Sequence, residues 1–241
     1  MPLTAVILAA GAGSRLGELA MRYSKATVPV AGRPLIYWIT DMLSAAGVEQ
    51  FVIVGHPSDS RLAEIMNELD RATLVIQRER RGIADALHCA LPAVNSEPAF
   101  LACACDSLYP VTEVETLIDR GRANLDDAIV GVLEMGRAAT ASRSVVQTDG
   151  EQVTQIVEKP VPGSVDSGLV ALPLYWLPQR FMPYCSYAAA NRGETYVSTA
   201  LNRFLLSGGT LRAVAFSRRL EVTTPEDLQS AATELAQPSS L

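Results

Sequence analysis

The sequence predicts an α/β protein with a mixed, mainly parallel sheet and helices on both faces, which makes three layers. Through residues 4–134, short continuous apolar runs alternate with segments of helical period. Such runs are typical of parallel strands, which are buried on both faces. Through residues 144–175, β-like segments follow one another without helices between them. This second pattern predicts a small β-rich insertion in the later part of the chain.

The first half is expected to contain five strands joined by helices. The strands are predicted where apolar residues run without interruption, at 4–9, 50–55, 73–76, 99–104 and 127–134. The helices show apolar residues at helical spacing and a recognisable start or stop, at 34–46, 58–69, 82–93 and 110–123. Ser58 or Asp59 is expected to cap the second helix and Thr112 the fourth, because short polar side chains satisfy free N–H groups at helix starts.

The second half continues with β-like segments at 144–147, 152–157 and 168–175. Asp149–Gly150 is a turn signal between the first two of them. A helix at 194–206 and a strand at 210–216 follow, and the last helix, 225–235, is expected to be capped by Thr223 or Thr224. We expect one domain over residues 1–236 and a short tail over 237–241.

The composition excludes several classes of protein. The 241 residues are 49% hydrophobic and 19% charged, which excludes a disordered chain. The net charge of −6 disfavours a general nucleic-acid binder, which would carry a basic surplus. No apolar run approaches the roughly 20 residues that span a bilayer, and no basic region precedes the first one. We therefore expect a cytoplasmic protein with free cysteines and no nucleic-acid or membrane partner.

A glycine-rich stretch, L-A-A-G-A-G-S-R-L, occupies residues 8–16 and follows the first predicted strand. Small residues let the backbone approach an anion closely, and successive N–H groups can then point at phosphate oxygens. Arg15 adds a planar guanidinium with several donors. A dinucleotide-binding turn is disfavoured, because Leu16 stands where a third glycine is required and the second strand ends in Gly55-His56 without a carboxylate.

Lys25 follows ten residues after Arg15, in S-K-A-T-V-P-V-A-G-R-P-L (residues 24–35). Together the two stretches resemble the sugar-phosphate nucleotidyltransferase family, to which glucose-1-phosphate thymidylyltransferase belongs. That family reads L-A-A-G-x-G-x-R-L, then a lysine, then P-V-x-G-x-P-L-I, and the match covers residues 6–36. The resemblance implies a Rossmann-like nucleotidyltransferase fold with a nucleotide-binding half, 1–135, and a sugar-phosphate-binding half, 136–236.

The same resemblance implies the nucleotide site. Residues 77–87, Q-R-E-R-R-G-I-A-D-A-L, resemble the family's Q-x-x-x-x-G-T-A-x-A-L, in which the glutamine and the glycine backbone read a pyrimidine base. UTP or dTTP is therefore favoured. Arg15 is expected at the β- and γ-phosphates and Lys25 at the α-phosphate, as the catalytic residues. The expected nucleotide-binding residues are Leu8, Ala10, Gly11, Ala12, Gly13, Ser14, Gln77 and Gly82.

Two acidic positions resemble the family's metal ligands. Asp106 follows the strand F-L-A-C-A-C, where the family has Gly-Asp and this chain has Cys105 in place of the glycine. Glu221 is the second residue of L-E-V-T-T-P-E-D-L (residues 220–228), which resembles D-V-x-T-P-E-D-L with glutamate in place of the first aspartate. The resemblance therefore implies a Mg²⁺ held by Asp106 and Glu221.

Two further stretches resemble the family's sugar-phosphate motifs. V-E-K-P (residues 157–160) resembles the motif whose glutamate and lysine hold the sugar phosphate, here Glu158 and Lys159. G-E-T-Y (residues 193–196) resembles a motif that offers a carboxylate to sugar hydroxyls, here Glu194.

The implied reaction is Mg²⁺-dependent transfer of a nucleotidyl group from an NTP to a sugar 1-phosphate, giving an NDP-sugar and pyrophosphate. The substrates are small molecules, and the sequence leaves oligomerisation open. One alternative is a cytidylyltransferase acting on a non-sugar phosphate, because V-T-T-P-E-D-L resembles those enzymes too. Another is a non-catalytic nucleotide or nucleotide-sugar sensor of the same fold, which the departures at Cys105, Pro173 and Glu221 keep open.

Overall fold

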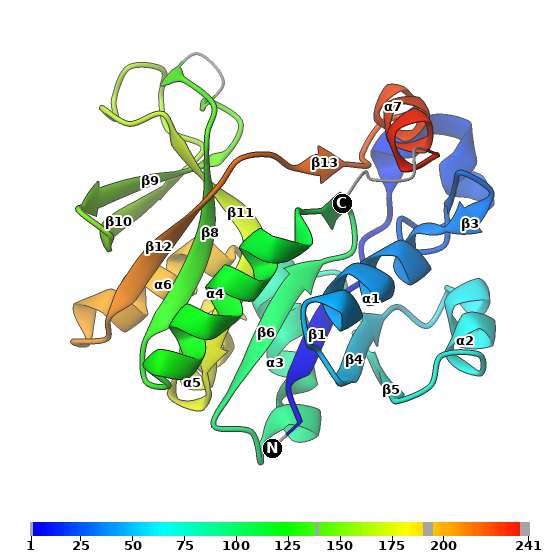
Figure 1. Cartoon of the computed structure of the whole chain (residues 1–241), viewed down its shortest axis with the longest axis horizontal. Coiled ribbons are helices and arrows are strands. Elements are labelled where there is room, and N and C mark those ends of the chain that lie inside the picture. The colour runs from blue at the N-terminus through cyan, green and yellow to red at the C-terminus, as the bar shows by residue number, and fades with distance from the viewer. Residues whose placement is uncertain (1, 138–139, 190–194, 237–241) are drawn as a thin grey trace.

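A nine-stranded mixed sheet runs through the centre of the molecule (Figure 1). The computed structural model describes residues 2–137, 140–189 and 195–236. The strands lie in the order β5-β4-β1-β6-β11-β8-β12-β10-β9. The predicted mixed α/β architecture is therefore confirmed.

The first half of the chain builds the parallel part of the sheet. Strand β1 (Thr4–Leu8) pairs in parallel with β4 (Gln50–Gly55) and β6 (Ala99–Ala104), and β5 (Ala72–Ile76) adds to β4. These strands are continuous runs of apolar residues, as expected for strands covered on both faces. Their carboxyl ends therefore meet at one edge of the sheet.

Helices connect these strands close to the predicted positions. They are α1 (Leu35–Ala45), α2 (Ser60–Met66), α3 (Ile83–Val94) and α4 (Val111–Ala123). Asp59 caps α2, since its Oδ1 accepts a hydrogen bond of 3.0 Å from the amide of Leu62. The predicted Thr112 cap is wrong. Pro110 occupies the N-cap of α4, no side chain caps that helix, and Thr112 lies within its first turn.

The second half completes the sheet in a different order. Strand β8 (Ala128–Glu134) pairs in parallel with β12 (Leu211–Phe216). Strand β11 (Leu169–Pro178) lies between β6 and β8 and is antiparallel to both. Strands β9 (Ser144–Asp149) and β10 (Gln152–Glu158) form a hairpin around Gly150. This hairpin is part of the β-rich insertion predicted over 144–175, whereas the last predicted segment, 168–175, is β11 of the central sheet. The hairpin extends the sheet beyond β12.

The remaining elements are short or lie in the second half. Helix α6 (Val197–Leu206) ends where predicted but begins three residues later than the predicted 194. Helix α7 (Pro225–Leu235) begins with a capping box in which Thr224 and Asp227 bond each other's backbone. The elements that sequence reasoning missed are the 3₁₀ helices η1 (Ser14–Met21) and η3 (Gln179–Phe181), the strand pairs β2 (Pro29–Val30) with β3 (Arg33–Pro34) and β7 (Ser107–Leu108) with β13 (Leu220–Glu221), and helix α5 (Met182–Ala189).

Helices cover both faces of the sheet and bury two apolar cores. One core packs residues of α1 and α4, such as Ile39 and Leu117, against the sheet. The other packs residues of α3 and α6, such as Leu87 and Leu201, against the opposite face. Figure 1 shows α1 and α4 in front of the sheet and α3, α5 and α6 behind it. Across the described residues, no helix has both the length and the apolar character needed to cross a membrane.

Candidate active site

A cavity of about 550 Å³ opens where β1 and β6 end. In α/β sheets, ligands bind beyond the carboxyl ends of the strands, and this volume is within the range of small-molecule sites. The sequence predicted most of the lining: Leu8, Ala10, Gly11, Ala12, Gly13, Ser14, Arg15, Lys25, Gln77, Gly82 and Asp106. The lining residues that it did not assign to a site are Arg80, Ile83, Ala86, Ala104 and Cys105.

The glycine-rich loop connects β1 to η1 along one wall of this cavity. Gly13 has a φ of 65°, the left-handed region that glycine adopts at little cost. A Cβ at this position would lie 3.3 Å from the side chain of Lys25, so the loop and the lysine pack closely. Arg15 is exposed at the start of η1, directly after the loop, and within the described residues it makes no hydrogen bond or ion pair. Its guanidinium is therefore available to an anion in the cavity.

Gln77 and Gly82 meet at the opposite wall. The amide nitrogen of Gln77 donates to the carbonyl oxygen of Gly82 at 3.2 Å and to Oδ2 of Asp85 at 2.7 Å. Gly82 has a φ of 105°, and a Cβ there would lie 2.6 Å from backbone atoms of Thr195. A residue with a side chain would therefore displace the segment that precedes α6. Sequence reasoning missed Asp85, because an aspartate in the first turn of a helix is commonplace.

Arg80 adds a second guanidinium to the cavity. Its Nε donates to the carbonyl oxygen of Ala10 at 2.8 Å, and so it links the loop after β5 to the glycine-rich loop. Nothing in the sequence distinguished Arg80 from Arg78 or Arg81, which lie in the same charged stretch.

Lys25 and Asp106 form an ion pair at the floor of the cavity. Lys25 Nζ lies 2.5 Å from Oδ2 of Asp106, and their side chains are only 12% and 15% exposed. Ser107 Oγ donates to Oδ1 of Asp106 at 2.9 Å, and Arg219 lies 3.8 Å from the same oxygen. Burial by itself raises the pKa of Asp106. The charges of Lys25 and Arg219 and the hydrogen bonds outweigh burial and hold that pKa below its usual value.

The pairing of β13 with β7 brings Glu221 beside Asp106. Glu221 lies opposite Ser107 in this short ladder. Its Oε1 lies 3.1 Å from Arg219 and accepts a hydrogen bond of 3.1 Å from Thr223, while its Oε2 accepts hydrogen bonds of 3.2 Å from Arg143. Arg219 therefore lies between the two carboxylates that the sequence predicted as a pair.

Sequence reasoning did not assign the two arginines that hold Glu221. Arg219 directly precedes β13, and a strand of two residues leaves no periodic pattern in the sequence that could have pointed to it. Arg143 comes from the start of β9, 78 residues away, and no local pattern points to it.

The two carboxylates fit a Mg²⁺ by their chemistry. Mg²⁺ prefers oxygen ligands and is usually held by one or two carboxylates together with substrate phosphates. Among the described residues, no group of three or more His, Cys, Asp or Glu side chains converges, so any further ligands would be hydroxyl or carbonyl oxygens, substrate or water. Lys25, Arg143 and Arg219 now neutralise the carboxylates, and a cation bound there would compete with them.

Glu158 and Lys159 lie at the end of β10 and do not line this cavity. Oε2 of Glu158 accepts hydrogen bonds from Ser144 at 2.6 Å and from Ser198 at 2.8 Å. Lys159 Nζ donates to the hydroxyl of Tyr196 at 3.0 Å. Glu194, the third residue expected on this side, lies outside the described residues.

The start of α6 connects this side to the nucleotide cavity. Two backbone hydrogen bonds hold Thr195 against the residues on either side of Gly82. The amide of Ala84 donates to the carbonyl oxygen of Thr195 at 3.2 Å, and the amide of Thr195 donates to the carbonyl oxygen of Arg81 at 2.7 Å. The residues that follow Thr195 hold Lys159 and Glu158.

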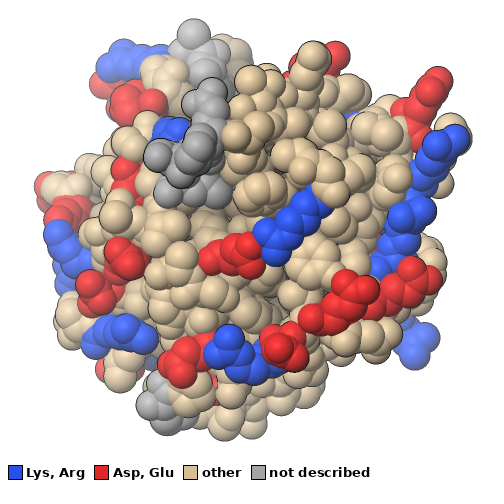
Figure 2. Space-filling model, turned by 45° about the vertical axis from the view of Figure 1, so that its right-hand side comes forward, with Lys and Arg blue, Asp and Glu red and all other residues tan. Residues whose placement is uncertain are grey.

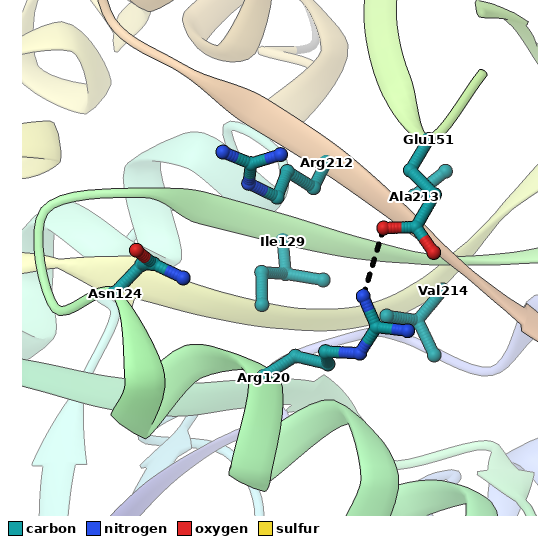
Figure 3. Close-up of a pocket in the computed structure, with 7 residues that line it drawn as sticks. All are labelled: Arg120, Asn124, Ile129, Glu151, Arg212, Ala213 and Val214. Atoms are coloured by element: carbon teal, nitrogen blue, oxygen red, sulfur yellow. Dashed lines mark hydrogen bonds and ion pairs between the residues drawn. The ribbon is translucent and has the colours of Figure 1, made fainter.

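A second cavity, of about 200 Å³, lies between α4 and the strands β8 and β12 (Figure 3). It contains two arginines, but Arg120 pairs with Glu151 at 2.8 Å and Arg212 with Asp127 at 2.7 Å. Its volume is below that of typical ligand sites. Paired cations in a small surface hollow do not form an anion site. In Figure 2, acidic and basic side chains are interspersed over the visible face, without one large basic patch.

The chain is similar to known proteins over most of its length. The MobA-like NTP transferase domain matches residues 5–205. The chain is 28% identical to UTP–glucose-1-phosphate uridylyltransferase AglF of Haloferax volcanii, over 95% of both chains. It is 29% identical to the bifunctional protein GlmU of Marinobacter nauticus over 94% of this chain, and it spans 47% of that protein.

Solved structures share the fold over nearly the whole chain. A UTP-bound UGPase from Acinetobacter baumannii has a TM-score of 0.84 at 21% identity, covering 100% of this chain and 96% of that one. A UDP-glucose pyrophosphorylase complexed with UDP-glucose has a TM-score of 0.85 at 19% identity, covering 98% and 99%.

Proposed function

The chain belongs to the MobA-like NTP transferase family, and on that premise we propose that it transfers a nucleotidyl group from UTP or dTTP to a sugar 1-phosphate. The products are an NDP-sugar and pyrophosphate. The observation that carries the proposal is the convergence of a glycine-rich loop, Arg15, Lys25 and the Asp106 carboxylate on one cavity at the carboxyl ends of β1 and β6. The similarity to a UTP–glucose-1-phosphate uridylyltransferase supports the class of acceptor.

The reaction needs no general base. An oxygen of the acceptor phosphate is already a nucleophile, and it attacks the α-phosphorus of the nucleotide. The bond between the α-phosphorus and the bridging oxygen breaks, and pyrophosphate leaves with the electron pair. The barrier lies in bringing two polyanions together in line, so catalysis consists mainly of positioning and charge stabilisation.

The chain supplies this stabilisation from several directions. The amides of the glycine-rich loop and Arg15 bind the β- and γ-phosphates, because both present donors to the cavity. Lys25 turns from Asp106 toward the α-phosphate, where negative charge increases in the transition state. Lys159, with Glu158 beside it, holds the acceptor phosphate at the end of β10, and Glu194 binds the sugar hydroxyls.

We assign Asp106 and Glu221 as the residues that would hold Mg²⁺. A bound Mg²⁺ would supply charge neutralisation at the phosphate oxygens. The role of this chain's residues is to keep the two carboxylates side by side through the β7–β13 pair. Lys25 and Arg219 balance the charge of both carboxylates in the absence of a metal ion.

Pyrophosphate release tests the proposal. The protein is incubated with Mg²⁺, each of five common nucleoside triphosphates, and a panel of sugar 1-phosphates. Release confined to UTP or dTTP with a sugar 1-phosphate is expected. Release only with non-sugar phosphates would favour the cytidylyltransferase alternative, and nucleotide binding without any release would favour a sensor.

A variant of Lys159 separates the acceptor side from the nucleotide side. We expect Lys159→Gln to raise the KM for the sugar 1-phosphate while nucleotide binding stays unchanged, because Lys159 lies outside the nucleotide cavity. An unchanged KM would refute the role assigned to Lys159.

A further inference from the structure

We propose that Asp85 holds the side chain of Gln77 as a hydrogen-bond acceptor and thereby selects a base with a ring N–H, uracil or thymine, over cytosine. The inference rests on the proposed function only in taking the 550 Å³ cavity as a nucleotide site. Asp85 is thus a positioning residue, which acts through Gln77.

The two hydrogens of the Gln77 amide are both used inside the protein. Gln77 lines the cavity but is only 3% exposed. Its nitrogen donates to the carbonyl oxygen of Gly82 and to Oδ2 of Asp85. A carbonyl oxygen and a carboxylate oxygen can only accept. Reversing the amide would place its oxygen against two acceptors, so these partners determine its orientation chemically.

Asp85 is itself held from two sides. Its side chain is almost completely buried, and its Oδ1 lies 3.0 Å from a guanidinium nitrogen of Arg81, in an ion pair that lacks hydrogen-bond geometry. Its backbone amide donates to Oγ1 of Thr195 at 3.2 Å. It also lies in the first turn of α3, where the helix dipole favours a carboxylate. The acceptor that orients Gln77 therefore cannot turn away easily.

Because the amide nitrogen of Gln77 is used within the protein, its amide oxygen is the side-chain group that remains to bind a ligand. A base that binds against this oxygen must supply an N–H. Uracil and thymine carry a hydrogen on N3, at the middle of their pairing edge, whereas cytosine has a lone pair there. Two acceptors facing each other leave both without a partner, which costs about a tenfold to a hundredfold in affinity.

Calorimetric binding to the full chain, without any acceptor, tests the inference. The ligands are UTP, CTP and N3-methyl-UTP, which lacks the ring N–H. We expect UTP to bind the wild type at least about tenfold more tightly than either of the others.

Asp85→Asn isolates the positioning role. Asparagine can donate as well as accept, so a reversed Gln77 amide would face one acceptor, the Gly82 carbonyl, instead of two. We therefore expect the UTP-to-CTP affinity ratio to fall, by up to about tenfold. When Gln77→Ala is already present, adding Asp85→Asn should not change the UTP-to-CTP affinity ratio further, because Asp85 acts through Gln77. Asp41→Asn, at an exposed ion pair with Arg33, is the matched control and should keep the wild-type ratio.

The outcomes separate this inference from the proposed reaction. Equal binding of UTP and CTP by the wild type would overturn the inference even if pyrophosphate is released. So would an Asp85→Asn variant that loses affinity for both nucleotides equally, since that is the result of a merely structural role. If that variant does not fold, the wild-type comparison of UTP with N3-methyl-UTP decides. Selective UTP binding without turnover would support the inference and count against the reaction alone.

Discussion

Replacing Lys25 with methionine should destabilise the protein through Asp106 and also stop nucleotidyl transfer. Methionine keeps most of the side-chain length but removes the charge. At the observed separation of 2.5 Å, two unit charges attract by about 6–7 kcal/mol at an effective dielectric constant of about 20, before their dehydration is counted. Loss of one partner from a buried pair costs about 3–5 kcal/mol. Because Arg219 remains 3.8 Å from Asp106, we expect a loss of about 2–3 kcal/mol in unfolding free energy.

The pH dependence of this loss has a definite sign. Lys25 is the strongest influence that lowers the pKa of Asp106 below its ordinary value of 3.8. A carboxyl group with a depressed pKa stabilises the folded state above its unfolded pKa, and this contribution disappears as the pH falls through the folded pKa. The stability difference between wild type and Lys25→Met should therefore be full at neutral pH and shrink as the pH falls below about 4.

Urea denaturation at several pH values and a pyrophosphate assay measure the two effects. Turnover should fall by about a hundredfold to a thousandfold, the usual effect of removing one group that stabilises transition-state charge. Adding Asp106→Asn should show a coupling energy of about 1–3 kcal/mol between the two positions, because they are in direct contact. Wild-type turnover, or a stability difference that does not change with acidification, would refute the reasoning.

Four further predictions concern the active site and the elements around it. Gly82→Ala places a methyl group 2.6 Å from the backbone of Thr195 at a φ of 105° and should cost about 3 kcal/mol or more in urea denaturation. Gly11→Ala, with no atom within 4 Å of its Cβ, should change stability by less than about 1 kcal/mol. Thr224→Ala removes the capping-box hydroxyl of α7 and should cost about 1 kcal/mol, read from the denaturation midpoint at constant slope. Burial raises the pKa of the Cys105 thiol to about 12, so at pH 8 mass spectrometry should find it alkylated only after unfolding, and rapid labelling of the native protein would contradict this.

The buried strands were the most predictable part of the fold. The bounds of β4 and β6 match the predictions, because a continuous apolar run has to be covered on both faces and leaves little choice of ends. The residues that cap the helices were harder to predict. Asp59 and Thr224 cap their helices, whereas Thr112 competes with Pro110, whose fixed φ already suits the start of a helix.

The site could be predicted only where local motifs carry it. The glycine-rich loop and Gln77 lie in stretches whose residue types and spacing are distinctive. The contacts of Asp85 and Arg143 depend on segments brought together by the fold, and a two-residue ladder such as β7–β13 leaves no periodic pattern in the sequence. Helix α5 was missed because M-P-Y-C-S-Y-A-A has no clear polar face.

The position of β11 has a consequence for the biosynthesis of the chain. This strand is made after β6 and β8 but lies between them. A nascent chain that ends before residue 169 therefore leaves one edge of β6 and both edges of β8 without partners, since β12 is also made later, and both strands are strongly apolar. Such edges are templates for aggregation. We expect a recombinant fragment of residues 1–135 to be insoluble when expressed alone, although it contains every residue that lines the nucleotide cavity.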